Sequence, residues 1–238
     1  MEEPAAALTS VTTLVFDVMG TVVDLDGSHA AQAAAALRQH GHDPAAAPAL
    51  AQHTDRLVGQ MMDDVRAGRA PWQHHRRLRE SALRTTLPAA GLTDPPAELV
   101  RTLAAVVTRL DPWPDSPAAL SQLRADFTVV ALSNADLAEL TALSQAGGLA
   151  WHVVLSGELV RSFKPDPAVY TQVATTLARS PAQLLMVAAH PWDLRAAAEQ
   201  GFRTAYVARP GADKPGPDDV FDLAVGDLTE LAQQLRRP

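Results

Sequence analysis

Residues 13–21, with the sequence TLVFDVMGT, constrain the fold of this chain more than any other stretch. The apolar residues 14–16 predict the end of a short buried strand, Asp17 follows directly, and Gly20 and Thr21 turn the chain. A short apolar run closed by turn residues is typical of a central strand in a parallel sheet, although periodicity alone also fits a helix. Because ligands of open α/β sheets bind outside the carboxyl ends of the strands, Asp17 is a candidate site residue. The alternative is a carboxylate that only caps the following turn or helix.

The composition excludes several classes of function. The chain has 238 residues, a formal net charge of −7 and no cysteine. Its charge does not suggest a nucleic-acid or anionic-membrane partner, and without cysteine there is no disulfide, thiolate metal site or cysteine nucleophile. The acidic residues 1–4 lack the features of a signal peptide, and no apolar run approaches the ~18 residues of a membrane span. We therefore expect a soluble cytoplasmic protein.

The order of the predicted elements indicates the fold class. After the first strand, residues 25–111 are rich in alanine, leucine, arginine and histidine and predict a helical insert, with helices over 30–39, 50–67, 72–87 and 98–110. From residue 117 helices and strands alternate, with strands predicted over 127–132, 152–155, 184–189, 204–207 and 223–225. Such alternation is typical of an α/β fold with a doubly wound parallel sheet.

Polar residues stand at the ends of several of these strands. They are Asp17 and Thr21, Ser133 and Asn134, and His190 and Asp193, with Lys164 in a loop between them. Neighbouring strand ends of a parallel sheet meet at one crevice, so these groups can share a pocket. There Asp17 can act as a nucleophile that water later regenerates, Lys164 can keep it ionised, and Asp193 can deprotonate the water. Ser133 and Asn134 offer donors to a carboxylate or phosphate group.

Four segments together resemble the haloacid dehalogenase superfamily. They are Asp17-x-x-Gly20-Thr21, Leu132-Ser133-Asn134, Lys164-Pro165-Asp166-Pro167 and the segment around Asp193. The resemblance covers nearly the whole chain and implies a Rossmann-like core with a cap inserted after the first strand. On this basis residues 1–24 and 112–238 are the predicted core, and residues 25–111 are the predicted cap.

Two positions favour a dehalogenase over the phosphatases of that superfamily. Phosphatases carry a second aspartate two residues after the nucleophile, where this chain has Met19, and usually an acidic pair for magnesium in the last motif, where it has one carboxylate and His190. A halide leaves as an anion and needs no general acid, and losing carboxylates weakens a magnesium site. We therefore predict carbon–halogen hydrolysis without a metal or other cofactor.

More closely, the chain is similar to the L-2-haloacid dehalogenases. The matching segments include Pro71-Trp72, residues 79–81, residues 112–115, residues 164–170, residues 188–193 and Arg209-Pro210. The resemblance implies a short 2-halocarboxylate as substrate, an ester on Asp17 and a homodimer. The implied catalytic residues are Asp17, Thr21, Lys164 and Asp193, and the implied substrate-binding residues are Met19, Ser133, Asn134, Tyr170, His190, Trp192 and Arg56.

Arg56 enters this set because the family has an arginine in the cap that receives the halide. An alignment on Pro71-Trp72 puts that position at Thr54 and Asp55, so Arg56 is the nearest candidate. The family also usually has tyrosine at the position of Met19, and asparagine or histidine at position 190.

Other readings remain open at this stage. A phosphatase or phosphonatase-like hydrolase of the same superfamily, or a catalytically silent binding protein with its fold, are the alternatives. Trp192 and His190 can serve as packing residues. The sequence also predicts solvated surface for the His74-His75 pair and for the helix face with Arg76, Arg77 and Arg79.

Overall fold

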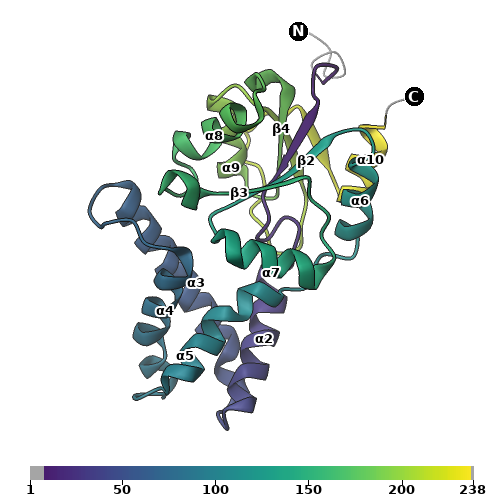
Figure 1. Cartoon of the computed structure of the whole chain (residues 1–238). Coiled ribbons are helices and arrows are strands. Elements are labelled where there is room, and N and C mark those ends of the chain that lie inside the picture. Colours follow the sequence, from purple (N-terminus) through teal and green to yellow (C-terminus); the bar gives the residue numbers. More distant parts are fainter. Residues whose placement is uncertain (1–7, 237–238) are drawn as a thin grey trace.

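The computed structural model of the chain describes residues 8–236, so the acidic start at residues 1–4 lies outside the described residues. Within them, six strands form one parallel sheet in the order β3-β2-β1-β4-β5-β6, and the predicted doubly wound α/β fold is confirmed (Figure 1). The strands are β1 (Thr13–Phe16), β2 (Thr128–Ser133), β3 (Val153–Ser156), β4 (Leu184–Ala188), β5 (Arg203–Val207) and β6 (Leu223–Val225).

Both faces of the sheet are buried, which explains why its strands are apolar throughout rather than alternating. On β1, Leu14 and Phe16 pack with the helices of one face, and Val15 packs with those of the other. The first face is covered by α6 (Ser116–Leu123), α7 (Leu137–Gly147) and α10 (Leu228–Gln234), and the second by α8 (Pro167–Leu177) and α9 (Pro191–Glu199). Each fully buried side chain of this kind contributes roughly 1.5–3 kcal/mol, so β1 is held firmly in the centre.

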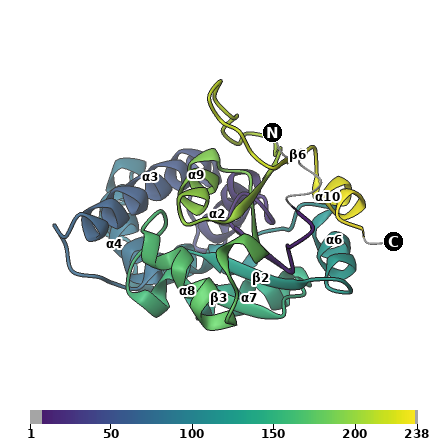
Figure 2. The same cartoon turned by 90° about the horizontal axis from the view of Figure 1, so that it is seen from above.

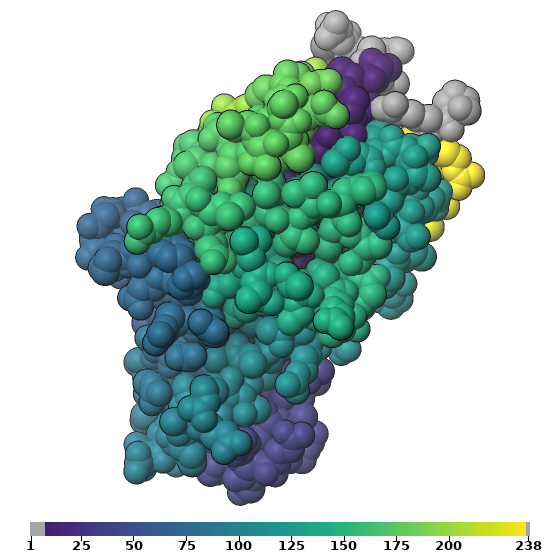
Figure 3. Space-filling view, in the orientation of Figure 1, coloured from purple at the N-terminus to yellow at the C-terminus, as the bar shows by residue number. Residues whose placement is uncertain are grey.

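The chain between β1 and β2 forms a separate group of helices. They are α2 (Leu25–Gln39), α3 (Ala47–Arg66), α4 (His75–Thr86) and α5 (Ala97–Ala104), with short 3-10 turns at Pro44–Ala46, Pro88–Ala90 and Ala105–Arg109. Four of their leucines, Leu37, Leu50, Leu87 and Leu99, belong to a core cluster of their own. We call residues 25–109 the helical segment. We call the other described residues, 8–24 and 110–236, the sheet part. The helical segment lies beside the carboxyl ends of the strands (Figure 1), and its helices α3 and α4 are at the end of the molecule opposite α6 and α10 (Figure 2). The space-filling view shows the helical segment in contact with the sheet part (Figure 3).

The chain enters and leaves the helical segment at one place. The N–H of Asp24 donates to the carbonyl of Asp111 at 2.9 Å, and the N–H of Trp113 donates to the carbonyl of Val22 at 3.0 Å. The two connections between the helical segment and the sheet therefore run side by side and are joined by backbone hydrogen bonds.

Several helix boundaries in the helical segment differ from the sequence prediction. Helix α2 begins at Leu25 rather than at residue 30, because Oδ1 of Asp24 accepts from the N–H of Gly27 at 3.0 Å. Helix α4 begins at His75 rather than at residue 72, and the predicted helix over 98–110 is α5 followed by a 3-10 turn. In the described part of the chain, no helix combines the length and the apolar character needed to cross a bilayer.

Candidate active site

Asp17 directly follows β1, a central strand at which the strand order of the sheet reverses. β1 pairs with β2 on one side and with β4 on the other, and such a reversal point is where α/β sheets bind their ligands. The backbone N–H of Asp17 donates to the carbonyl of Val187 at 3.0 Å, which extends the pairing with β4 by one residue. The predicted position of Asp17 at the tip of a central strand is confirmed.

The turn after Asp17 depends on Gly20. Its φ is +85°, a region that favours glycine, and an added Cβ would lie 2.9 Å from Nε2 of His190. The turn brings the hydroxyl of Thr21 back to Asp17, where it donates to Oδ2 at 2.6 Å. The same hydroxyl accepts from the N–H of Ala189 at 2.9 Å, so Thr21 ties the end of β1 to the end of β4.

Lys164 joins two buried carboxylates. Its Nζ donates to Oδ1 of Asp17 at 2.8 Å and to Oδ2 of Asp193 at 2.5 Å, and the hydroxyl of Tyr170 donates to Oδ1 of Asp193 at 2.6 Å. The loop that carries Lys164 is held by Asn134, whose Oδ1 accepts from the N–H of Lys164 at 2.7 Å. Every polar atom in this chain of contacts therefore has a partner, as burial requires.

The environment separates the pKa values of the two carboxyl groups. Burial opposes ionisation of Asp17, but the charges of Lys164 and His190 and the hydrogen bonds from Lys164 and Thr21 outweigh it and lower its pKa. Burial raises the pKa of Asp193, and the nearby charge of Asp17 adds to that effect. Burial also opposes the charge on Lys164, yet Asp17 and Asp193 raise its pKa above the ordinary value. The lowered pKa keeps Asp17 ionised, as attack by a carboxylate would require, and the raised pKa of Asp193 is in the direction that suits a base.

A cavity of about 240 Å³ lies between the sheet and the helical segment. Asp17 and Lys164 line its sheet side, and Leu25, Val58 and Met62 form part of an apolar wall. Of the residues predicted for the site, those that line this cavity are Asp17, Met19, Ser133, Asn134, Lys164, His190 and Trp192. Thr21, Tyr170 and Asp193 are fully buried behind them and reach the cavity through their contacts with Asp17 and Lys164.

Arg56 does not belong to this group, and its assignment as the arginine of the helical segment needs correction. Its side chain is exposed and does not line the cavity, whereas its neighbour Asp55 does. The reason is the rotation of about 100° between successive residues of a helix, which turns Arg56 away when Asp55 faces the cavity.

Among the described residues that line the cavity, the arginine contributed by the helical segment is Arg79 on α4. The sequence prediction of a solvated face holds for Arg76 and Arg77, which are exposed, but it is wrong for Arg79, which is 2% exposed and lines the cavity. Helical spacing was the signal that could have identified it. Arg79 lies four residues after His75 and three before Ala82, and both are buried.

Arg79 is held by a compact trio with Asp55 and His29. Its Nη1 donates to Oδ1 of Asp55 at 2.7 Å, its Nη2 contacts Nε2 of His29 at 2.9 Å, and Nδ1 of His29 contacts Oδ2 of Asp55 at 2.8 Å. Because a guanidinium only donates, Nε2 of His29 accepts from Arg79, and Nδ1 of His29 donates to Asp55. Although burial opposes it, the hydrogen bond from His29 and the charge of Arg79 lower the pKa of Asp55 to about 2.

One donor of the trio is unpaired within the described part of the chain. The Nε–H of Arg79 is buried and has no hydrogen-bond acceptor among the described residues. An unsatisfied buried donor is costly, so an anion or a polar ligand atom placed there gains a strong interaction.

His75 is also buried, which corrects the predicted solvated surface for this residue, whereas the side chain of His74 is 44% exposed. His75 lines the cavity, and its Nδ1 lies 2.8 Å from Oε2 of Glu139. Glu139 is distant in sequence, on α7, and so the pairing could not be anticipated from local spacing.

Comparison with known proteins gives consistent results. Residues 11–201 match the family model of haloacid dehalogenase-like hydrolases. (S)-2-haloacid dehalogenase H-109 of Pseudomonas putida is 33% identical over 162 residues, which span 66% of this chain and 70% of that protein. (S)-2-haloacid dehalogenase 1 of Pseudomonas sp. (strain CBS-3) is 28% identical over 95% of this chain and 97% of its own length.

Solved structures give the same picture for the fold. A crystal structure of an L-2-haloacid dehalogenase has a TM-score of 0.87 and 33% identity, and covers 94% of this chain and 98% of its own. A defluorinating L-2-haloacid dehalogenase has a TM-score of 0.89 and 29% identity, and covers 95% of this chain and 96% of its own.

Proposed function

The chain belongs to the haloacid dehalogenase-like hydrolase family, and from that premise we propose that it hydrolyses short 2-haloalkanoic acids to 2-hydroxy acids. The similar enzymes named above are haloacid dehalogenases. The observation that carries the proposal is Asp17, a carboxylate that lines the cavity while Lys164 and Thr21 bind its two oxygens.

In the first step, a carboxylate oxygen of Asp17 attacks C2 of the substrate as the carbon–halogen bond breaks. The electron pair leaves with the halide, which requires no proton, and an ester to Asp17 forms. Met19 fits this chemistry because its thioether donates no proton, whereas the leaving alcohol of a phosphate ester would need one.

In the second step, water attacks the carbonyl carbon of the ester and releases the 2-hydroxy acid. Esterification removes the charge of Asp17, so Lys164 loses one of its two carboxylate partners and becomes free to bind the substrate carboxylate. Asp193 accepts the proton of the attacking water, and its raised pKa suits a base. The carbonyl–oxygen bond to the substrate then breaks, the proton passes to the departing alkoxide oxygen to give the hydroxyl group, and Asp17 and Asp193 are both regenerated as carboxylates.

Two sets of side chains bind the substrate in this proposal. Ser133, Asn134 and Lys164 bind the carboxylate from the sheet side, where all three line the cavity. Arg79, rather than Arg56, receives the departing halide, because its buried Nε–H faces no acceptor among the described residues. Three more of the predicted substrate-binding residues, Trp192, His190 and Met19, also line the cavity. The last of them, Tyr170, does not line it and contacts Asp193 instead, so we assign it a role in positioning Asp193.

We assign the helical segment the role of a cap domain, with domain boundaries after residues 24 and 111. Two observations support this assignment. The helices have an apolar cluster of their own, and the two connections to the sheet are joined by the hydrogen bond from the N–H of Asp24 to the carbonyl of Asp111. In this proposal Arg79 belongs to the cap and Asp17 to the core. The nucleophile and the halide site therefore come together only when the cap contacts the core.

The donor set beside Asp17 argues against the phosphatase alternative. A magnesium-dependent phosphatase needs oxygen ligands converging beside the nucleophile. Here the ammonium of Lys164 contacts two carboxylates, 2.8 Å from Asp17 and 2.5 Å from Asp193. Met19 and His190 stand at positions where the phosphatases have carboxylates, which leaves fewer oxygen ligands for magnesium, so we propose a reaction without a metal at Asp17.

Isotope labelling under single-turnover conditions tests the covalent step. With enzyme in excess over L-2-chloropropionate in ¹⁸O-water, an ester on Asp17 leaves the label in the peptide that contains Asp17, and the first product carries none. Label in the first product would instead mean direct attack by water and would contradict the ester. Halide release with and without chelator, compared with turnover of a phosphomonoester panel, decides between the two enzyme classes.

A cytoplasmic location and a homodimeric state are also part of the proposal, on the basis of the sequence and the family resemblance. Cell fractionation and light scattering of the purified protein test them directly.

A further inference from the structure

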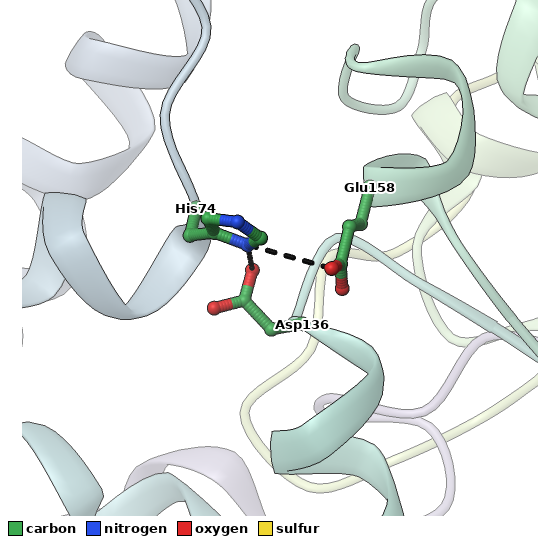
Figure 4. A group of neighbouring side chains, drawn as sticks. All are labelled: His74, Asp136 and Glu158. Atoms are coloured by element: carbon green, nitrogen blue, oxygen red, sulfur yellow. Dashed lines mark ion pairs between the residues drawn. The ribbon is translucent and has the colours of Figure 1, made fainter.

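Three side chains outside the cavity meet where the helical segment contacts the sheet part (Figure 4). His74 directly precedes α4, Asp136 directly precedes α7, and Glu158 lies in the 3-10 turn Gly157–Val160. Each offers one ligand atom, and the three atoms lie within 4.8 Å of one another. The sequence showed no carboxylate at ligand spacing from His74, because both acids come from segments more than 60 residues away along the chain.

The distances fit a shared cation better than they fit a direct ion pair. Nδ1 of His74 lies 3.4 Å from Oδ1 of Asp136 and 3.5 Å from Oε1 of Glu158. Charge-assisted hydrogen bonds between nitrogen and carboxylate oxygen are shorter, about 2.7–2.9 Å. In a tetrahedral zinc site with bonds of about 2.0–2.1 Å, neighbouring ligand atoms lie about 3.4 Å apart.

The two carboxylates are already oriented by backbone donors. Asp136 accepts from the N–H groups of His75 at 2.8 Å and Arg76 at 3.2 Å. Oε2 of Glu158 accepts from the N–H of Leu137 at 2.8 Å, which points Oε1 toward His74. Outer contacts of this kind fix metal ligands in place before the metal arrives.

The local charge also favours a cation. Asp136 and Glu158 both face the imidazole of His74. The carboxyl group of Glu139, whose Oε2 accepts from the N–H of Asp136 at 3.0 Å, is paired with His75 instead. One nitrogen ligand with two carboxylates suits zinc and similar transition metals better than magnesium, which prefers an all-oxygen shell.

We propose that His74, Asp136 and Glu158 bind one divalent transition-metal ion, with zinc as the matching class, and that the ion clamps the helical segment to the sheet part. Water completes the coordination, because His74 is partly exposed. The ion takes no part in the reaction at Asp17. This site is independent of the proposed dehalogenase activity, and binding can be present whether or not haloacids are substrates.

Isothermal titration of the untagged full-length protein with zinc chloride at pH 7.5, after chelator treatment, tests the site. Two variants remove one ligand each. His74→Ala removes the nitrogen, and Glu158→Gln removes the charge but keeps an oxygen for the N–H of Leu137. His53→Ala is the matched control, since His53 is exposed on α3. Magnesium chloride serves as the second titrant.

We expect one zinc ion per chain in the wild type and the His53→Ala protein, with at least tenfold weaker binding in both ligand variants and weaker binding of magnesium throughout. Zinc should also raise the melting temperature of the wild type but not of the two ligand variants. Absence of stoichiometric zinc binding in the wild type, or equal affinity in the wild type and both ligand variants, overturns the proposal. Circular dichroism of each variant excludes misfolding as the cause of a lost signal.

Discussion

The ammonium of Lys164 lies 2.8 Å from Oδ1 of Asp17, and the side chains of both residues are almost inaccessible, at 1% and 7% exposed. A buried ion pair of this kind adds little net stability by itself, but removing one partner leaves an uncompensated charge in the interior. At this pair the cost is larger still, because Lys164 also contacts Asp193, which is 0% exposed. Stability and activity therefore depend on the same ammonium.

Replacing Lys164 by methionine should reduce both properties together. The two carboxylates would then face each other without a cation, and we expect the free energy of unfolding to fall by about 3–5 kcal/mol. Haloacid turnover should fall below detection, because the pKa of Asp17 would rise and the substrate carboxylate would lose its partner. Urea unfolding and halide release measure the two effects. The control is Lys214→Met at an exposed position, which should change the free energy of unfolding by less than about 0.5 kcal/mol.

Replacing Tyr170 by phenylalanine should move the acid limb of the kcat profile to higher pH. The hydroxyl of Tyr170 donates to Oδ1 of Asp193 at 2.6 Å and stabilises its ionised form. Without this donor the already raised pKa of Asp193 rises further, so a larger fraction of the base is protonated at a given acid pH. We expect a shift of about one pH unit, the equivalent of one hydrogen bond to a charged group. Tyr206→Phe, which removes a hydroxyl that donates to the carbonyl of Asp213, should leave the limb unchanged. An unchanged limb in Tyr170→Phe would contradict the role of Asp193 as the base.

The sheet and the residues at its strand ends could be predicted from the sequence because the signals are local. A short apolar run followed by Asp17, Gly20 and Thr21 carries its own turn chemistry, and the same holds for Ser133 and Asn134 at the end of β2. The spacing of such motifs along an alternating chain is enough to place them at one edge of a parallel sheet.

The cavity wall from the helical segment could not be predicted in the same way. Whether an arginine faces solvent or a cavity depends on the rotation of its helix. Asp55 and Arg56 are consecutive residues of one helix, yet Asp55 faces the cavity and Arg56 faces solvent. The partners of Arg79 are His29 and Asp55, which lie 50 and 24 residues away. His75 contacts Glu139, and His74 lies near Glu158. Both contacts depend on how two distant parts of the chain pack together, which a local sequence pattern does not predict.

Arg79→Met should impair catalysis where Arg56→Met does not. Arg79 lines the cavity with its Nε–H free of acceptors in the described part of the chain, whereas Arg56 is exposed. If Arg79 receives the halide, its loss removes stabilisation of the charge that develops on the leaving group, and kcat/KM should fall by roughly 10²-fold or more. Product inhibition by added chloride or bromide should weaken in parallel. A kcat/KM that falls in Arg56→Met but not in Arg79→Met would return the role to Arg56.

Asp55→Asn should remove an acid-dependent part of the stability. The pKa of Asp55 is lowered from 3.8 to about 2 in the folded protein, so its ionised form contributes stability that is fully present above about pH 4 and is lost as the pH falls through about 2. The difference in free energy of unfolding between the wild type and Asp55→Asn should therefore be about 1 kcal/mol smaller at pH 3 than at pH 5. Urea unfolding at the two pH values measures it. The exposed control Asp94→Asn should follow the wild type at both. A difference that stays constant between pH 5 and pH 3 would mean that Asp55 is not held ionised by His29 and Arg79, and the trio would then not be the rigid support of Arg79 that its distances of 2.7–2.9 Å indicate.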